Sequence, residues 1–314
     1  MIRLGGYQPP DSVHTRAAAF FGRTLETLSA GRVRLDLVGN VLALGRRSDQ
    51  LPAMVRSGEL SICYGTSVWF AGAVPALQVL DLPYVVKDRP TAHGAFDGEM
   101  GAWLGARLAA ATPLRLLGIW DNGFRHVSNR VRPIRHPADC RGLRIRTQPS
   151  RVHVEAFEAL GAVPIPVDVK EFVEQIAGER FDGQDNPLTN TYNFGVHRFH
   201  RHLTLSGHFF GASLFVCNEA HYRSWDEATR SAVDEAARAA TAFQHGLAAA
   251  EDAEVLARLD PAQNEIVRLD PVQREAFAAA TRPVLEKYRQ TLEPKMFEWL
   301  GAPGPTERPR SPRP

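Results

Sequence analysis

The first 64 residues alternate between strand patterns and helix patterns, and no other feature of the sequence constrains the fold as strongly. Short runs with apolar residues at strand spacing lie at residues 2–4, 33–37 and 60–64. One helix pattern begins at Asp11 or Ser12 and ends at Gly31, and a second begins at Ser48. Strands that alternate with helices predict an α/β fold with a mainly parallel sheet.

The length of the chain predicts two lobes with a cleft between them. The chain has 314 residues, and a single hydrophobic core stops growing at about 250–300 residues. Because a strand pattern at 203–215 would return the chain to the first lobe, the predicted lobes are discontinuous. They comprise residues 1–123 with about 208–246, and residues 124–207 with about 247–300. A helix pattern at 225–259, roughly 50 Å long, would brace both lobes.

The remaining elements follow from the same patterns. Further strands are predicted at 114–120, 124–128, 143–147, 163–167 and 180–184, with a turn at 121–123. Further helices are predicted at 91–111, 150–160, 170–177 and 271–300. Residues 301–314 hold five prolines and three arginines without apolar periodicity, and we expect them to form a disordered tail.

Composition and motifs exclude several classes of protein. Thirty-seven basic and 35 acidic residues leave a net charge of +2 without long runs of one sign, which argues against a nucleic-acid partner. Cys63, Cys140 and Cys217 form no C-x-x-C pair, so we expect neither a zinc site nor a disulfide framework. No apolar run approaches the roughly 20 residues of a membrane span, so we expect no direct membrane insertion.

Metal sites and cofactors are also not expected. The sequence lacks a nucleophile elbow, a phosphate-binding loop, a dinucleotide fingerprint and a zinc-protease motif. The densest histidine cluster, at 197–202, is interleaved with two arginines whose charge would oppose a bound cation. We interpret this cluster as a solvated basic turn.

Two arginines lie in segments with strand patterns. Arg125 belongs to the strand predicted at 124–128, and Arg146 alternates with Arg144 on one face of the strand at 143–147. Both could be surface arginines on a solvated strand face. An arginine that faces a cleft between lobes could instead hold a carboxylate, because its planar fork offers two parallel charge-assisted hydrogen bonds.

Four further residues are candidates for the cleft. Tyr7 and Trp69 follow predicted strands, where ligand crevices form in parallel sheets, although core packing explains most aromatic residues at such positions. His208 precedes the pair Phe209 and Phe210, which core packing also explains. Asn186 lies before Pro187 in a segment that fits a strand-to-helix turn, or it could turn its amide towards a polar ligand.

Taken together, several segments resemble one family. They are YQPPDSVH at 7–14, VLDLPY at 79–84, DNGFRH at 121–126, RPI at 132–134, PAD at 137–139, GLRIR at 142–146, LGA at 160–162 and DGQDNP at 182–187. Their order and spacing over residues 2–300 resemble the periplasmic solute-binding subunit of tripartite ATP-independent periplasmic (TRAP) transporters, the DctP-like proteins. The resemblance implies a two-lobed, Venus-flytrap periplasmic-binding-protein fold.

The resemblance also implies a function and a site. Such a receptor closes on a small organic acid and delivers it to the membrane permease subunits of a TRAP transporter, which an ion gradient drives. In this family the arginine at the position of Arg146 pairs with the ligand carboxylate, the one at Arg125 assists, and the asparagine at Asn186 contacts ligand. Asp185 replaces the usual glutamate, and the small Val169 argues against sialic acid as the ligand.

Location and assembly are expectations from the same resemblance. We expect a periplasmic protein whose signal peptide is removed or missed in this sequence, and we expect it to act as a monomer. Two alternatives stay open. One is an enzyme on the same fold, a lyase or deaminase that uses His126 or His208, and the other is a sensory ligand-binding module.

Overall fold

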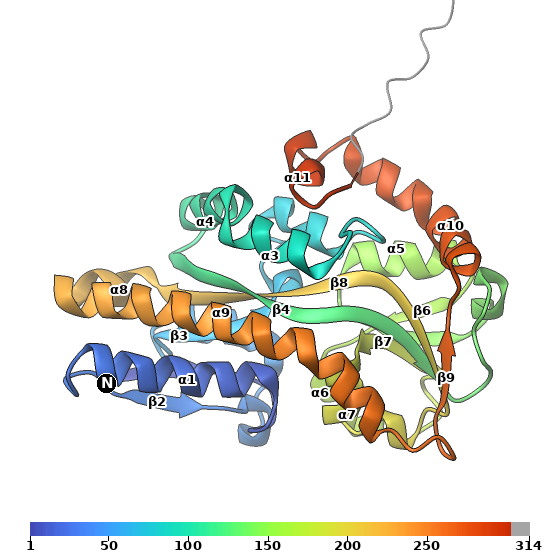
Figure 1. The fold of residues 1–314 in the computed structure, drawn as a ribbon, viewed down its shortest axis with the longest axis horizontal. Helices are drawn as coiled ribbons and strands as arrows, with labels where there is room; N and C mark the ends of the chain where they lie inside the picture. The colour runs from blue at the N-terminus through green and yellow to red at the C-terminus, as the bar shows by residue number, and fades with distance from the viewer. Residues whose placement is uncertain (303–314) are drawn as a thin grey trace, which may run out of the picture.

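In the computed structural model, which describes residues 1–302, nine strands form one sheet (Figure 1). The strand order is β2-β1-β3-β8-β4-β7-β5-β6, and β9 pairs with β8. The strands are β1 (Ile2–Gly5), β2 (Leu35–Val38), β3 (Ile62–Thr66), β4 (Leu114–Asn129), β5 (Arg144–Thr147), β6 (Val163–Pro166), β7 (Gly183–Pro187), β8 (His202–Asn218) and β9 (Glu265–Arg268).

Two long strands divide the sheet into two lobes. The end of β8 at residues 213–217 pairs with β3, whereas its beginning at residues 202–205 pairs with β9. Similarly, β4 pairs with β7 only from Arg125 onwards. The strands β1, β2 and β3 therefore belong to one lobe and β5, β6, β7 and β9 to the other, while β4 and β8 run through both. The predicted two-lobed α/β fold is confirmed.

Helices cover the sheet. They are α1 (Val13–Leu28), α2 (Leu51–Arg56), α3 (Arg89–Asp97), α4 (Glu99–Ala111), α5 (Arg151–Ala159), α6 (Val169–Gln175), α7 (Leu188–Asn193), α8 (Glu219–Ser224), α9 (Glu227–Arg258), α10 (Pro271–Arg289) and α11 (Pro294–Trp299). Short 3-10 helices are η1 (Val41–Leu44), η2 (Ser48–Gln50), η3 (Ser67–Trp69), η4 (Pro75–Asp81), η5 (Pro137–Cys140) and η6 (Val196–Arg198).

The long helix α9 lies along β4 and spans both lobes (Figure 1). It packs against α1 in the first lobe and against α7 in the second. Its alanines at 232, 236 and 240 recur at helical spacing and are buried, so the helix can approach the sheet closely. The predicted bracing helix is confirmed.

The region predicted as a turn at 121–123 is instead part of β4, so this prediction was wrong. The strand continues because β8 pairs with it on both sides of the segment, with a register shift between Asp121 and Gly123. Gly123 has φ +92°, which a glycine tolerates, and its N–H donates to the Asp121 carboxylate at 2.6 Å. This β-bulge replaces the predicted turn.

The sheet is mixed rather than mainly parallel. The outer pairs β1–β2, β1–β3, β5–β6, β5–β7 and β8–β9 are parallel. Three of the four pairs that involve the long strands, β3–β8, β4–β7 and β4–β8, are antiparallel. The strand-and-helix alternation of each lobe thus predicted the outer strands other than β9, but it held no information on how the long strands join the lobes.

Several predicted boundaries need correction. Gly98 separates α3 from α4, and Pro294 begins α11, so the helices predicted at 91–111 and 271–300 are each two helices. The strand predicted at 180–184 is β7 at 183–187, and Pro187 is both its last residue and the N-cap of α7. The predictions missed α8 and β9. The lobe boundaries stay predictions, and the predicted tail lies outside the described residues from position 303 onwards.

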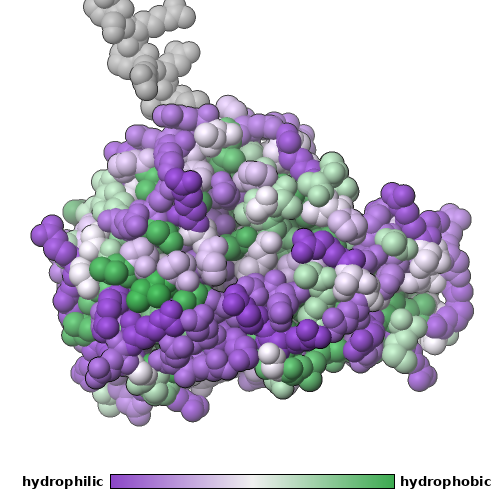
Figure 2. All heavy atoms as spheres, turned by 180° about the vertical axis from the view of Figure 1, so that it is seen from behind, coloured by the Kyte–Doolittle hydropathy of each residue, from purple (hydrophilic) through white to green (hydrophobic). Residues whose placement is uncertain are grey.

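No helix within residues 1–302 combines the length and apolar character needed to cross a membrane. On the face opposite to that of Figure 1, hydrophobic residues gather in small groups among hydrophilic ones (Figure 2). The three cysteines are buried free thiols.

Candidate functional site

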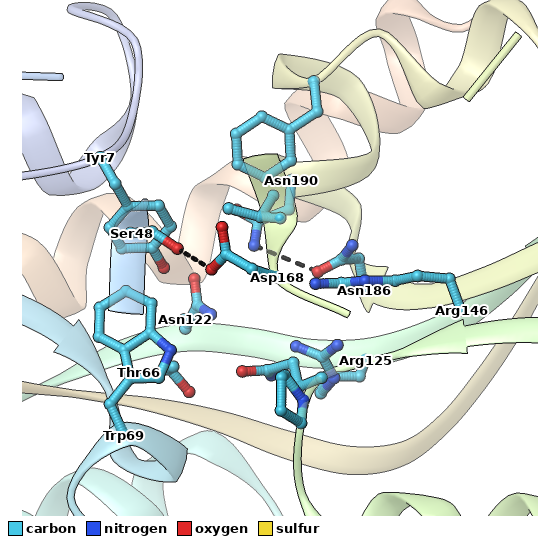
Figure 3. A pocket seen from close by; sticks show the side chains of 14 residues that line it. Tyr7, Ser48, Thr66, Trp69, Asn122, Arg125, Arg146, Asp168, Asn186 and Asn190 are labelled. Atoms are coloured by element: carbon cyan, nitrogen blue, oxygen red, sulfur yellow. Dashed lines mark hydrogen bonds between the residues drawn. The ribbon is translucent and has the colours of Figure 1, made fainter. Parts of the chain in front are cut away.

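A cavity lies where the two lobes meet (Figure 3). Both lobes and the strand β4 between them contribute to its wall. The lining residues are Tyr7, Ser48, Thr66, Trp69, Asn122, Arg125, Arg146, Gln148, Pro149, Asp168, Val169, Asn186, Asn190 and Phe194. Five of the six predicted ligand-binding residues are therefore brought together.

Strand ends position most of these side chains. Tyr7 follows β1, Thr66 ends β3, and Trp69 lies in the 3-10 helix that follows β3. From the other lobe, Arg146 is the penultimate residue of β5 and Asn186 that of β7. The carboxyl ends of parallel strands thus meet at one cavity, as is typical of open α/β sheets.

Arg125 is held by a buried carboxylate. Its Nε donates to Asp185 Oδ2 and its Nη2 to the Asp185 carbonyl, both at 2.6 Å. The exposed fraction of the two side chains is 1% and 0%. Burial alone would raise the pKa of the Asp185 carboxyl, but the charge of Arg125 holds it well below its usual range. The charge of Arg125 is therefore already compensated within the protein.

Arg146 has no such partner. Its Nε and Nη2 donate to the Val167 carbonyl at 3.2 and 2.8 Å, and its guanidinium lies 5.2 Å from the ring centre of Phe172. Among the described residues no carboxylate oxygen lies within 4.0 Å of it. The residue is 2% exposed, and burial lowers its pKa to about 10, so it stays charged at neutral pH.

The neighbouring Arg144 shows the contrast along one strand. Its side chain is 45% exposed and pairs with Asp182 at 2.7 Å. The interpretation as a surface arginine thus holds for Arg144 and is wrong for Arg146, because the latter lies beneath α6, against Phe172.

Asn186 lines the cavity within a chain of buried amides. Its Oδ1 accepts from Asn190 Nδ2 at 3.3 Å, and its Nδ2 donates to Gln184 Oε1. Asn190 Oδ1 in turn accepts from Gln8 Nε2 at 2.9 Å, across the gap between the lobes. The protein itself therefore fixes the orientation of Asn186.

Two hydrogen bonds join the lobes over the cavity. One is the bond from Gln8 to Asn190, and the other runs from the Ser48 hydroxyl to Asp168 Oδ2 at 2.6 Å (Figure 3). Both are buried and connect residues more than 100 positions apart in the sequence. The lobes are therefore closed in this structure.

The two predicted aromatic residues lie together, whereas His208 lies elsewhere. The rings of Tyr7 and Trp69 meet edge to face with centroids 5.2 Å apart, and burial raises the pKa of Tyr7. His208 is not among the lining residues. Its Nδ1 lies 2.7 Å from Ser206 Oγ and its Nε2 lies 3.7 Å from Asp185 Oδ2, so it sits behind the ion pair of Arg125.

The cavity contains residues that the sequence did not reveal. Asn122 was assigned to a turn, and its position in the bulge of β4 depends on pairing with β8. Asp168 caps α6 by accepting from the Lys170 N–H at 3.0 Å, a capping signal that says nothing about a cavity. Ser48 could be found only through its contact with Asp168.

The histidine cluster at 197–202 does not form one site. The ring of His197 stacks on Tyr192, His200 Nδ1 lies 2.9 Å from Ser128 Oγ, and His202 Nδ1 lies 3.1 Å from Glu265. Over residues 1–302, no group of three or more His, Cys, Asp and Glu side chains is arranged to hold a metal ion.

Comparisons with known proteins agree on one family. The family model of bacterial extracellular solute-binding proteins, family 7 (DctP), matches residues 4–291. The 2,3-diketo-L-gulonate-binding periplasmic protein of Escherichia coli is 30% identical over 270 residues, which are 86% of this chain and 80% of that protein.

Solved structures give the same result. A sugar-acid-binding protein of Advenella mimigardefordensis in complex with galactonate has a TM-score of 0.89 at 25% identity, with 95% of this chain and 96% of that chain covered. A TRAP periplasmic solute-binding protein of Sulfurospirillum deleyianum with bound succinate has a TM-score of 0.89 at 25% identity, with coverage of 96% and 98%. The chain therefore belongs to family 7 of the bacterial extracellular solute-binding proteins, the solute-binding proteins of TRAP transporters.

Proposed function

We propose that this protein binds a small organic acid in the closed cavity, with the ligand carboxylate on Arg146, for uptake by a TRAP permease. One observation carries the proposal. Arg146 is a buried cation that lines the cavity and has no carboxylate partner within 4.0 Å among the described residues. A buried charge without a partner is unfavourable, so a ligand carboxylate would supply the missing counter-charge.

The geometry of the guanidinium agrees with this role. Val167 occupies Nε and Nη2 of Arg146, and Nη1 has no hydrogen-bond partner among the described residues. Nη1 of Arg125 likewise has no hydrogen-bond partner among the described residues, because Asp185 accepts from Nε and Nη2. We expect the Nη1 groups of the two arginines to share one ligand carboxylate, with Arg125 assisting and Arg146 supplying the net charge.

Closure would couple binding to a change of shape. Ligand binding would favour the closed lobes, because water leaves as they close and the ion pair strengthens in a medium of low dielectric constant. We place the hinge at residues 121–125 of β4 and 206–212 of β8. There the two long strands pair with neither β3 nor β9, and Gly123 and Gly207 have positive φ. This lies close to the predicted lobe boundaries.

Partners and location follow from the family. TRAP solute-binding proteins work in the periplasm with membrane permease subunits, and we expect the same of this chain, as a monomer. Its relatives bind a diketo sugar acid, galactonate or succinate, so an organic acid is the expected ligand class. The enzyme alternative is less well supported, because neither His126 nor His208 lines the cavity.

A thermal-shift screen tests the proposal. The purified protein would be heated with a panel of organic acids and, as controls, with uncharged sugars and amino acids. A ligand at 100 times its Kd should stabilise the protein by about 2.7 kcal/mol, which raises Tm by several degrees. We expect shifts with one class of acids only. If no acid raises Tm, and mass spectrometry under denaturing conditions finds no co-purified acid, the proposal is wrong.

A further inference from the structure

The two sides of the cavity differ in chemistry (Figure 3). Arg125 and Arg146 lie on one side, and they are the only lysine or arginine side chains among the 14 lining residues. Tyr7, Ser48, Thr66 and Trp69 lie on the other side, with Asn122 and Asp168 between. A ligand whose carboxylate lies on the arginines must therefore direct the rest of its carbon chain towards neutral polar groups, aromatic rings and one anion.

Asn122 offers a free acceptor at this position. Its side chain lines the cavity, it is 2% exposed, and its Oδ1 has no hydrogen-bond partner among the described residues. The backbone on either side is fixed, because the Asp121 N–H donates to Gln244 and the Gly123 N–H donates to the Asp121 carboxylate. A buried amide oxygen without a partner is unfavourable, and a ligand hydroxyl would satisfy it.

Asp168 adds a second acceptor, which carries negative charge. Its Oδ2 accepts from Ser48 at 2.6 Å and its Oδ1 from the Lys170 N–H at 3.0 Å. Each carboxylate oxygen can accept a further hydrogen bond. No described lysine, arginine or histidine nitrogen lies within 4.0 Å of this carboxylate. A second carboxylate on the ligand would thus meet a buried like charge rather than a cation.

We propose that the cavity selects monocarboxylic acids with several hydroxyl groups, such as aldonates, and discriminates against dicarboxylic acids. Asn122 and Asp168 accept hydrogen bonds from the ligand hydroxyls, and Asp168 repels a second carboxylate. The inference rests on the proposed function, because it assumes that the one ligand carboxylate lies on the arginines. Beyond the proposed function, it specifies the kind of carbon chain that is attached to the ligand carboxylate.

Matched six-carbon acids test the two parts separately by titration calorimetry. D-gluconate and D-galactonate are the aldonates, hexanoate has the same length without hydroxyls, and D-glucarate and galactarate carry a second carboxylate in place of the terminal hydroxymethyl group. We expect one aldonate to bind about 100-fold or more tightly than hexanoate, because a site built for hydroxyls rejects analogues that lack them. We expect a similar factor over the matching dicarboxylate.

Two variants assign these preferences to residues. Asn122→Leu has nearly the same shape without the acceptor, and it should lower the ratio of aldonate to hexanoate affinity about 10-fold. Asp168→Asn keeps an acceptor for Ser48 and removes the charge, and it should raise the affinity for the dicarboxylate about 10-fold. The second change is a gain of binding, which a damaged fold would not produce.

The outcomes separate this inference from the proposed function. If hexanoate or a dicarboxylate binds as tightly as the aldonates, the inference is overturned while the carboxylate receptor stands. The inference is also overturned, while the proposed receptor function stands, if Asn122→Leu leaves the ratio of aldonate to hexanoate affinity unchanged and Asp168→Asn leaves the affinity for the dicarboxylate unchanged. If acids of all these kinds fail to bind, the proposed function fails and the inference fails with it.

Discussion

Arg125 and Arg146 line the same cavity from strands of the same sheet, yet their surroundings differ in charge. Arg125 donates to the buried carboxylate of Asp185 and to its carbonyl. Arg146 donates to one backbone carbonyl and lies over the ring of Phe172. One guanidinium is therefore neutralised by the protein, and the other has no counter-charge within 4.0 Å among residues 1–302.

The difference suggests a division of labour between the two arginines. The pair of Arg125 and Asp185 contributes to the stability of the closed cavity wall whether or not a ligand is bound. The buried charge of Arg146 is stabilised when a ligand carboxylate binds, because only then does it have a counter-charge. Both arginines lie in segments with strand patterns, but we expect substitutions at them to have different effects. Changing the partner of Arg125 should lower stability, and changing Arg146 should weaken ligand binding.

The largest expected effect is on stability, from Asp185→Asn. This change keeps the shape of the side chain but leaves the buried charge of Arg125 without its partner, which should lower the free energy of unfolding by about 3–5 kcal/mol. Denaturant unfolding measures it. The matched control is Asp182→Asn, which removes the carboxylate partner of the exposed Arg144 and should lower it by less than about 1 kcal/mol. Equal losses in the two variants would contradict the account of Arg125.

The next largest effect is on binding, from Arg146→Met. The change removes the guanidinium with its charge and all its hydrogen bonds but keeps much of the bulk over Phe172, and it should weaken acid binding by about 2–5 kcal/mol. Arg146→Lys should also weaken binding, because an ammonium group lacks the fixed planar geometry with which the guanidinium donates to Val167 and presents Nη1 to the ligand. Titration calorimetry measures both.

Arg144→Met is the control for these variants. It lies two residues away on the same strand, but its side chain is exposed and pairs with Asp182. We expect its acid affinity to equal that of the unchanged protein. If Arg144→Met weakens binding as much as Arg146→Met does, the effect belongs to the strand and not to the buried guanidinium.

A smaller effect is the pH dependence of stability that His208 contributes next to the ion pair of Arg125 and Asp185. Burial lowers the pKa of His208, which lies behind the ion pair. Below the usual histidine pKa of about 6.5, the unfolded chain binds a proton that the folded protein does not, so stability falls as pH falls. One such group gives a slope of at most about 1.4 kcal/mol per pH unit.

The variant His208→Phe tests this slope. It should flatten the decline of the free energy of unfolding below pH 6.5, measured by denaturant unfolding at several pH values. Part of the decline should persist, because burial also lowers the pKa of His14 to about 4 and those of His126 and His200 to about 3. An unchanged slope would mean that His208 titrates alike in the folded and unfolded chain.

The sequence predicted elements within each lobe better than the connections between lobes. Strands β1, β2 and β3 could be predicted, because local apolar alternation and helix caps mark them. The continuation of β4 through Asp121 to Gly123 could not, because these residue types are typical of a turn and the strand depends on pairing with β8, about 90 positions later. The same long-range pairing explains the missed antiparallel centre of the sheet.

The cavity shows the same limit. Strand ends and the family resemblance indicated Tyr7, Trp69, Arg125, Arg146 and Asn186, all of which line it. Ser48 and Asp168 meet only when the lobes close, so no local pattern could pair them. His208 was predicted from its place before Phe209 and Phe210, but between Thr204 and Phe209 the strand β8 bulges opposite His126 and carries His208 behind the wall.

The most direct test of the central claim is a crystal structure of the protein with the acid that gives the largest thermal shift. We expect a carboxylate oxygen of the ligand to lie within hydrogen-bond distance, about 2.7–2.9 Å, of Arg146 Nη1, while Asp185 still holds Arg125. A ligand carboxylate bound to other residues, with Arg146 still donating only to Val167, would contradict it.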